Sequence, residues 1–318
     1  MGPKTKKYSM GCLLSTLFLC SLCIIGALPL CNPGFRPNLR FQLPAIRIAP
    51  ERLTVIPIPG FPLPITNSLV ATLLTTILLI TFAFFATRKM ELVPKGVQNF
   101  AEMAVDAIYG LVVSVAGEKR APNFFPWVAT IFIFVLVSNY LGLIPGLAAI
   151  GIKEVHQGET VIVPFLRSPS TDLNMTVGLA LVSVFATQYY GIRALGTLRY
   201  TSKFFNFRGL FTLPALLAGE EKLETMDLIM EIMRRAIIDP FVGLLELVSE
   251  VAKIISFSFR LFGNIFAGEV VLLVIGFLLP YLATPAFLGL ELFVGLIQAF
   301  IFAVLTLAFM TMATLTHE

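Results

Sequence analysis

The chain has 318 residues, of which 57% are hydrophobic and 13% are charged, and its mean hydropathy is +0.88. This composition excludes an ordinary soluble domain and predicts an integral membrane protein. The net charge of +4 is spread over short loops, and no basic run is long enough to bind nucleic acid.

Six apolar runs set the predicted topology, at residues 11–30, 68–87, 124–150, 173–192, 236–279 and 286–316. If the N-terminus lies inside and each run crosses the membrane once, the inside segments contain 15 lysines and arginines and the outside segments contain 6. Inner loops of membrane proteins carry the excess of basic residues. The sequence therefore predicts that both ends of the chain lie on the inner side.

The first 67 residues are expected to precede the membrane domain. Residues 1–31 begin with three lysines and continue with an apolar stretch, a pattern typical of a signal peptide and also compatible with an uncleaved anchor. All four cysteines lie here, and because their spacing matches no ligand pattern, we favour membrane packing over a disulfide or a metal site. Residues 32–67 are rich in proline and predict an irregular external lead-in to a membrane domain over residues 68–318.

Two helices are predicted next. Residues 66–68, Thr-Asn-Ser, are expected to cap the helix over residues 68–87. In residues 91–116, apolar side chains recur every three or four positions and polar ones fill the other side. This pattern predicts an amphipathic helix along the inner interface, with a packing helix in a soluble cap as the alternative.

Polar residues mark the outer end of two further spans. Ser138 and Asn139 lie inside an apolar run, where such a pair most often joins helices. Thr171 or Asp172 is expected to cap the helix over residues 173–192. Asn174 follows directly and is predicted at the outer mouth, where a polar lining begins.

The apolar run over residues 236–279 contains an arginine, Arg260, near its middle. Arginine at a bilayer centre costs about 2.5–3.5 kcal/mol and stays protonated, so the side chain needs a polar pathway or a partner. At 100° per residue, six residues lie within about 40° of one line along the helix. They are Glu246, Ser249, Lys253, Ser256, Arg260 and Asn264. We favour a functional role for this stripe; the alternative is that Arg260 reaches a headgroup or pairs with a buried acid.

Helix length predicts the architecture of the C-terminal part. Asp239 to Phe277 gives roughly 58 Å of helix, and the last run gives roughly 46 Å, whereas the hydrocarbon core is about 30 Å thick. The fold class is therefore an all-α integral membrane protein that ends in a long, strongly tilted helical hairpin. It has five core membrane helices, an N-terminal signal-like segment and an amphipathic interfacial helix. In the last helix Glu291 and Gln298 share a face, and a buried glutamate suits a residue that gives and takes protons.

The motifs of nucleotide-binding and metal-dependent enzymes are missing from the sequence. It contains no Gly-x-x-x-x-Gly-Lys-[Ser/Thr], no Gly-x-Gly-x-x-Gly after a strand and no His-Glu-x-x-His. We therefore expect no bound nucleotide, no cofactor, no metal and no group-transfer chemistry.

Several motifs together resemble one family. Residues 259–264 (Phe-Arg-Leu-Phe-Gly-Asn) and 267–269 (Ala-Gly-Glu) resemble the signature of the a subunit of F-type ATP synthases. Further motifs similar to that family follow its order along the chain, at residues 91–99, 138–146, 171–174 and 296–302. The chain resembles bacterial members most, which implies the bacterial plasma membrane; a plastid thylakoid or mitochondrial inner membrane is the alternative.

The resemblance implies a non-catalytic stator that lies beside a rotating ring of c subunits and binds the b-subunit peripheral stalk. Arg260 matches the essential arginine that faces the ring carboxylates. Asn264, Glu269 and Gln298 match polar positions of the proton path, and Glu291 falls where some relatives carry histidine. Glu246 and Ser256 match positions near the inner exit path.

The expected mechanism uses two half-channels that do not meet. The outer one is assigned to Asn174, Glu269, Glu291 and Gln298, and the inner one runs from Arg260 toward Ser256 and Glu246. Protons are the expected ion rather than Na⁺, because no cluster of oxygen ligands is evident. Two alternatives stay open, a self-contained secondary transporter and an assembly scaffold; the internal repeats and broken helices that favour a transporter are not clear in the sequence.

Overall fold

The computed structural model describes residues 50–56, 63–88, 90–144, 151–156, 159–204, 233, 238–279 and 283–315. These residues all belong to one compact unit that begins at residue 46. The signal-like segment over residues 1–31 and residues 205–232 of the inner loop lie outside the described residues. The predictions made for them, and the boundary of the membrane domain at residue 68, stay predictions.

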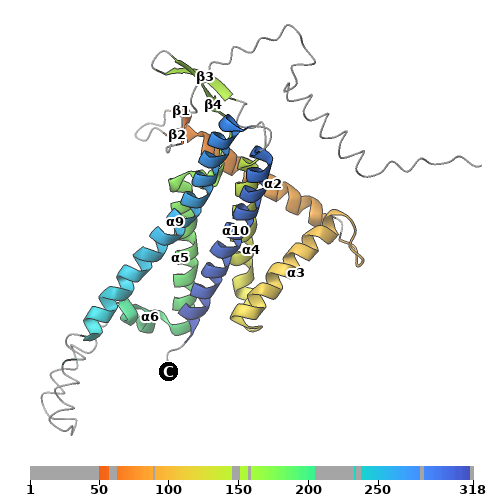
Figure 1. Ribbon diagram of the computed structural model, residues 1–318. Coiled ribbons are helices and arrows are strands. Elements are labelled where there is room, and N and C mark those ends of the chain that lie inside the picture. The colour runs from red at the N-terminus through yellow and green to blue at the C-terminus, as the bar shows by residue number, and fades with distance from the viewer. Residues whose placement is uncertain are drawn as a thin grey trace, which may run out of the picture. The chain divides into compact units, whose positions relative to one another are not determined.

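The described part of the chain is built of long helices, as the sequence predicts (Figure 1). They are α2 (Asn67–Thr87), α3 (Val97–Ala116), α4 (Ala121–Gly142), α5 (Leu173–Leu195), α9 (Asp239–Leu278) and α10 (Thr284–Thr314), with the short α6 (Thr197–Phe204) after α5. The six long helices have the length and hydropathy to cross a membrane. The set includes α3, whose interfacial position stays a prediction.

Two antiparallel strand pairs accompany the helices. Strands β1 (Arg52–Ile56) and β2 (Leu63–Thr66) pair just before α2, and β3 (Gly151–His156) pairs with β4 (Glu159–Pro164). The sequence predicted an irregular segment over residues 32–67. This prediction is wrong for the residues that form β1 and β2. Three prolines, Pro57, Pro59 and Pro62, fall between the two strands in the sequence, while Thr54, Val55 and Ile56 are β-branched and favour a strand.

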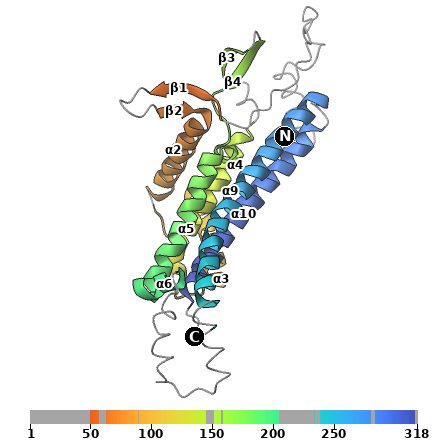
Figure 2. The ribbon, with the colours of Figure 1, turned by 90° about the vertical axis from the view of Figure 1, so that its left-hand side faces the viewer.

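The C-terminal hairpin forms the centre of the helix packing. Helix α10 packs against α4, α5 and α9, and α5 also packs against α9 (Figures 1 and 2). With 40 residues, α9 is roughly 60 Å long, twice the hydrocarbon core of about 30 Å. An upright, straight helix of this length does not fit within the hydrocarbon core, so the observed length is consistent with the predicted tilt, which stays a prediction.

The N-terminal ends of α2 and α5 are fixed by side-chain caps. Thr66 Oγ1 accepts a hydrogen bond from the Leu69 N–H at 3.3 Å, which caps α2. Asp172 caps α5, because its Oδ1 accepts from the Asn174 N–H at 2.9 Å. Its Oδ2 accepts from Ser68 Oγ at 2.6 Å. One buried carboxylate therefore begins α5 and ties it to the start of α2.

Of the predicted pair Ser138 and Asn139, the Asn139 side chain joins helices, whereas the Ser138 hydroxyl has no hydrogen-bond partner among the described residues. Asn139 Nδ2 donates to the Gly295 carbonyl of α10 at 3.0 Å, and Asn139 Oδ1 accepts from Ser170 Oγ at 2.6 Å. Ser168 Oγ donates to the Ser138 carbonyl at 3.2 Å. These buried bonds connect α4 to α10 and to the short 3₁₀ helix η2 (Pro169–Thr171). The outer loop that contains η2 is thereby held firmly against the helices.

Candidate functional site

Arg260 lies at the edge of the packed face of α9. Phe257, Leu261 and Ile265 are 3%, 0% and 5% exposed and pack into a core shared with α4, α5 and α10. The Arg260 side chain is partly exposed beside this face, and its Nη2 lies 3.5 Å from Ser256 Oγ, at the limit of a hydrogen bond. Within the described ranges no acid pairs with Arg260. Pairing with a buried acid, one of the structural alternatives, is therefore not found in the described part.

The side of α9 that bears Arg260 is open. Ser256 and Asn264, one turn before and one turn after Arg260, are exposed, and so is Ala267. Gly263 follows Arg260 by three residues, and a Cβ added there would meet no atom within 4 Å. A permanent charge therefore lies on a side of an otherwise apolar helix that the other described elements leave partly exposed.

Lys253 shares the predicted stripe but turns away from Arg260. Its Nζ donates to Glu250 Oε1 at 2.7 Å and lies 4.8 Å from the centre of the Phe309 ring of α10. Glu250 lies outside the predicted stripe and was not among the expected site residues. Lys253 is thus separated from the other residues of the stripe, because its charge is paired with Glu250 and its ammonium group packs against an aromatic ring.

The predicted residues of α9 and α10 meet in pairs along the hairpin. Asn264 Nδ2 donates to Gln298 Oε1 at 2.8 Å. One turn further along α9, Gly268 faces Glu291, and its missing side chain leaves the space that the glutamate carboxyl group fills. Glu291 and Gln298 are 4% and 2% exposed, and Glu291 Oε1 and Gln298 Nε2 have no hydrogen-bond partner among the described residues. This row of buried groups retains donors and acceptors that can exchange a proton with water or with a neighbour.

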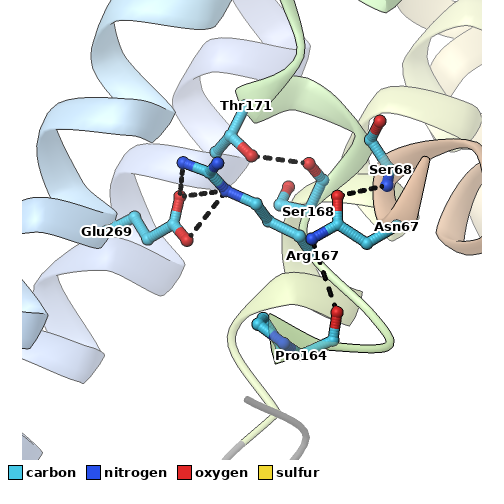
Figure 3. A network of polar contacts seen from close by, with 7 residues as sticks. All are labelled: Asn67, Ser68, Pro164, Arg167, Ser168, Thr171 and Glu269. Carbon is cyan, nitrogen blue, oxygen red and sulfur yellow. Dashed lines mark hydrogen bonds and ion pairs between the residues drawn. The ribbon is translucent and has the colours of Figure 1, made fainter. Parts of the chain in front are cut away.

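Glu269 points to a different partner, Arg167, in the segment between β4 and η2 (Figure 3). Arg167 Nε lies 3.1 Å and 3.2 Å from the two carboxylate oxygens, and its Nη2 lies 3.1 Å from Oε2. Sequence reasoning missed Arg167, which was counted only as a loop charge. The available signal was weak: Arg167 is one of just two basic residues in the outer segment over residues 151–172.

Not all expected residues are brought together. The Asn174 side chain is exposed at the start of α5 and has no hydrogen bond to Glu269, Glu291 or Gln298. Ser256 contacts Arg260 as described, whereas Glu246 lies nearer the start of α9 and makes no hydrogen bond to Ser256. The described contacts therefore form a cluster near the turn of the hairpin, called the outer cluster after its predicted side, and a looser series of polar residues toward the start of α9.

A buried tyrosine, also missed in the sequence, lies near that second series. Tyr200 of α6 is 3% exposed, and its hydroxyl donates to Gln188 Oε1 at 2.7 Å. Burial, and to a smaller extent the charges of Glu250 and Glu246, raise the pKa of Tyr200 to about 12. Tyr200 thus remains a neutral donor at physiological pH beside two carboxylates of α9.

Long apolar helices that align charged and amide side chains along a hairpin define a multi-pass membrane protein of the ion-translocating class. The sequence model of the family described as ATP synthase A chain matches residues 69–311. The chain therefore belongs to this family, the a subunits of F-type ATP synthases.

Two relatives illustrate the similarity. The ATP synthase subunit a of Moorella thermoacetica is 31% identical over 248 residues, which cover 78% of this chain and 90% of that protein. The ATP synthase subunit a of Helicobacter pylori strain Shi470 is 31% identical over 245 residues, covering 77% and 88%. The predicted family is confirmed, and with it a proton-translocating role in the membrane sector of an ATP synthase.

Proposed function

We propose that the chain forms two offset half-channels and presents Arg260 as a fixed cation to a rotating ring of c subunits. The observation that carries the proposal is the environment of Arg260. This charge lies on a partly exposed side of the apolar helix α9 and has no acidic partner in the described part. A charge at membrane depth is tolerated when a partner or a polar pathway faces it, and a ring of carboxylates supplies such a partner.

The outer half-channel is assigned to Asn174, Glu269, Glu291 and Gln298. The contacts of Gln298 with Asn264 and of Glu291 with Gly268 support this assignment for the two residues of α10. Asn264 lies one turn from Arg260 on α9, so it connects the outer cluster to the arginine. The inner half-channel is assigned to Ser256 and Glu246, on the same stripe toward the start of α9.

The fixed charge drives the proton transfers on the ring. A ring carboxylate that arrives opposite Arg260 is drawn to its charged form and releases its proton to the inner path. When it leaves Arg260 it becomes neutral again by taking a proton from the outer path. The guanidinium blocks direct passage between the two paths, so each proton travels with the ring. Each charge that crosses yields about 2.3 kcal/mol per 100 mV of membrane potential.

In this mechanism the chain makes and breaks no covalent bond of a substrate, and ATP synthesis takes place elsewhere in the complex. The proposed partners are the c ring, the b-subunit peripheral stalk and the lipid bilayer. The bacterial origin of the two relatives described above supports a bacterial plasma membrane as the location. The match to residues 69–311 supports a membrane domain over residues 68–318.

Reconstitution of the purified chain into liposomes tests the proposal. With the chain alone we expect no proton flux above that of empty liposomes, and flux should appear when the c ring is added, because the half-channels do not meet without it. A pH-sensitive dye inside the liposomes measures the flux. Proton-coupled uptake of a solute by the chain alone would instead support a self-contained secondary transporter.

A further inference from the structure

We propose that Arg167 is a positioning residue of the outer half-channel, which holds the Glu269 carboxylate in the path by which protons reach the ring. The inference rests on the proposed function, because it gives a role to a contact of one of the assigned residues. Arg167 comes from the outer loop and Glu269 from α9, and the two are 102 residues apart in sequence.

The ion pair fixes the orientation of the carboxylate. Arg167 uses two nitrogens, Nε and Nη2, and reaches both carboxylate oxygens of Glu269 at 3.1–3.2 Å. A planar guanidinium that binds both oxygens restrains the rotation of a carboxylate, which a single ammonium group does not. The Arg167 guanidinium also lies 5.8 Å from the centre of the Phe266 ring, so it contacts two neighbouring side chains of α9.

The chain on either side of Arg167 is anchored to two helices, α4 and α2. Ser168 is bonded to the Ser138 carbonyl of α4, and Thr171 Oγ1 donates to the Ser168 carbonyl at 2.8 Å. Before Arg167, the Pro164 carbonyl accepts from Asn67 Nδ2 of α2 at 3.4 Å (Figure 3). Residues 168–172 are all buried. The arginine is therefore held by a rigid segment, unlike a charged side chain at the tip of a free loop.

Arg167 and Glu269 differ in how deeply their side chains are buried. The Arg167 side chain is 9% exposed, whereas that of Glu269 is 38% exposed. A cation this buried is costly unless it is paired, so the contact differs from an ordinary surface ion pair. The carboxylate keeps an open side, where water that enters the outer path can bind. The two acids of the cluster thus differ, since Glu269 is held by Arg167 while Glu291 Oε1 has no hydrogen-bond partner in the described part of the chain.

Three variants of the assembled synthase separate a positioning role from a structural one. Arg167→Ala removes the side chain, Arg167→Met keeps much of its apolar length without charge, and Arg167→Lys keeps the charge without the planar fork. The readout is ATP-driven proton pumping in inverted membrane vesicles, divided by the amount of assembled complex. We expect about a tenfold loss for the alanine and methionine variants and no more than about a threefold loss for lysine. Arg193→Ala, at an exposed arginine in the last turn of α5, is the matched control and should pump normally.

Two results would overturn the inference. Normal pumping per complex in Arg167→Met would show that the charge is not needed. The second result concerns assembly. If the complex assembles with arginine or lysine at position 167 but with neither alanine nor methionine, the ion pair is required for assembly rather than for proton entry. Arg260→Gln in the same vesicles separates this failure from that of the proposed function. If Arg260→Gln is inactive while Arg167→Met is normal, only the role of Arg167 falls.

Discussion

Arg260→Gln should abolish ATP-driven proton pumping, with a loss of at least about 100-fold, while the synthase still assembles. Glutamine is polar but carries no charge, so a ring carboxylate that arrives opposite it is no longer drawn to its charged form. Two opposite charges 4 Å apart attract by about 4 kcal/mol at an effective dielectric constant of 20, which is close to a thousandfold in a protonation equilibrium. Quenching of a pH-sensitive dye in inverted vesicles measures the pumping.

Arg193→Gln is the control for loss of an arginine at an exposed site of the same chain. It should assemble and pump as the unmodified synthase does. Wild-type pumping by an assembled Arg260→Gln complex would contradict the mechanism, since Arg260 would then be a structural residue that reaches toward the headgroups.

Gly268→Ala should inhibit pumping by at least about tenfold without a comparable loss of stability. A Cβ at this position would overlap the carboxyl group of Glu291. That group is the end of a flexible side chain, so the helices can keep their packing while the carboxyl group moves away. The expected effect of the substitution is therefore a displaced Glu291 carboxyl group in the outer path. Pumping and the thermal stability of the detergent-purified complex are measured on the same preparations.

Two further variants test whether the loss of pumping comes from the position of Glu291. Gly178→Ala in α5 adds a methyl group where no atom lies within 4 Å, and it should leave pumping unchanged. Glu291→Asp shortens the acid by one methylene, so combining it with Gly268→Ala should restore part of the lost pumping. If Gly268→Ala pumps at the wild-type rate, the position of the Glu291 carboxyl group does not limit proton entry.

Features that depend on local sequence could be predicted before the structure. Thr66 and Asp172 cap helices as expected, because a capping side chain contacts backbone two or three residues away. The seven-residue spacing of Glu291 and Gln298 predicted a shared helix face. Both side chains are buried, and they meet Gly268 and Asn264 of α9. Helical periodicity is a property of the chain itself, so these relations need no tertiary information.

Contacts between distant segments could not be predicted in the same way. The pairing of Arg167 with Glu269 depends on how the outer loop folds over α9, and no spacing in the sequence encodes it. Lys253 shares the angular position of the stripe, yet its long side chain turns to Glu250 and Phe309. A helical wheel fixes the direction of Cβ but leaves the end of a four-carbon side chain free.

The central claim is that protons cross only by riding the ring past Arg260. The most direct measurement is the passive proton conductance of vesicles that contain the assembled membrane sector, before and after the ring is cross-linked to this chain so that it cannot turn. The fixed-cation mechanism predicts that cross-linking reduces the conductance to that of vesicles without protein. An undiminished conductance with the ring locked would contradict it, because the protons would then pass directly from one half-channel to the other.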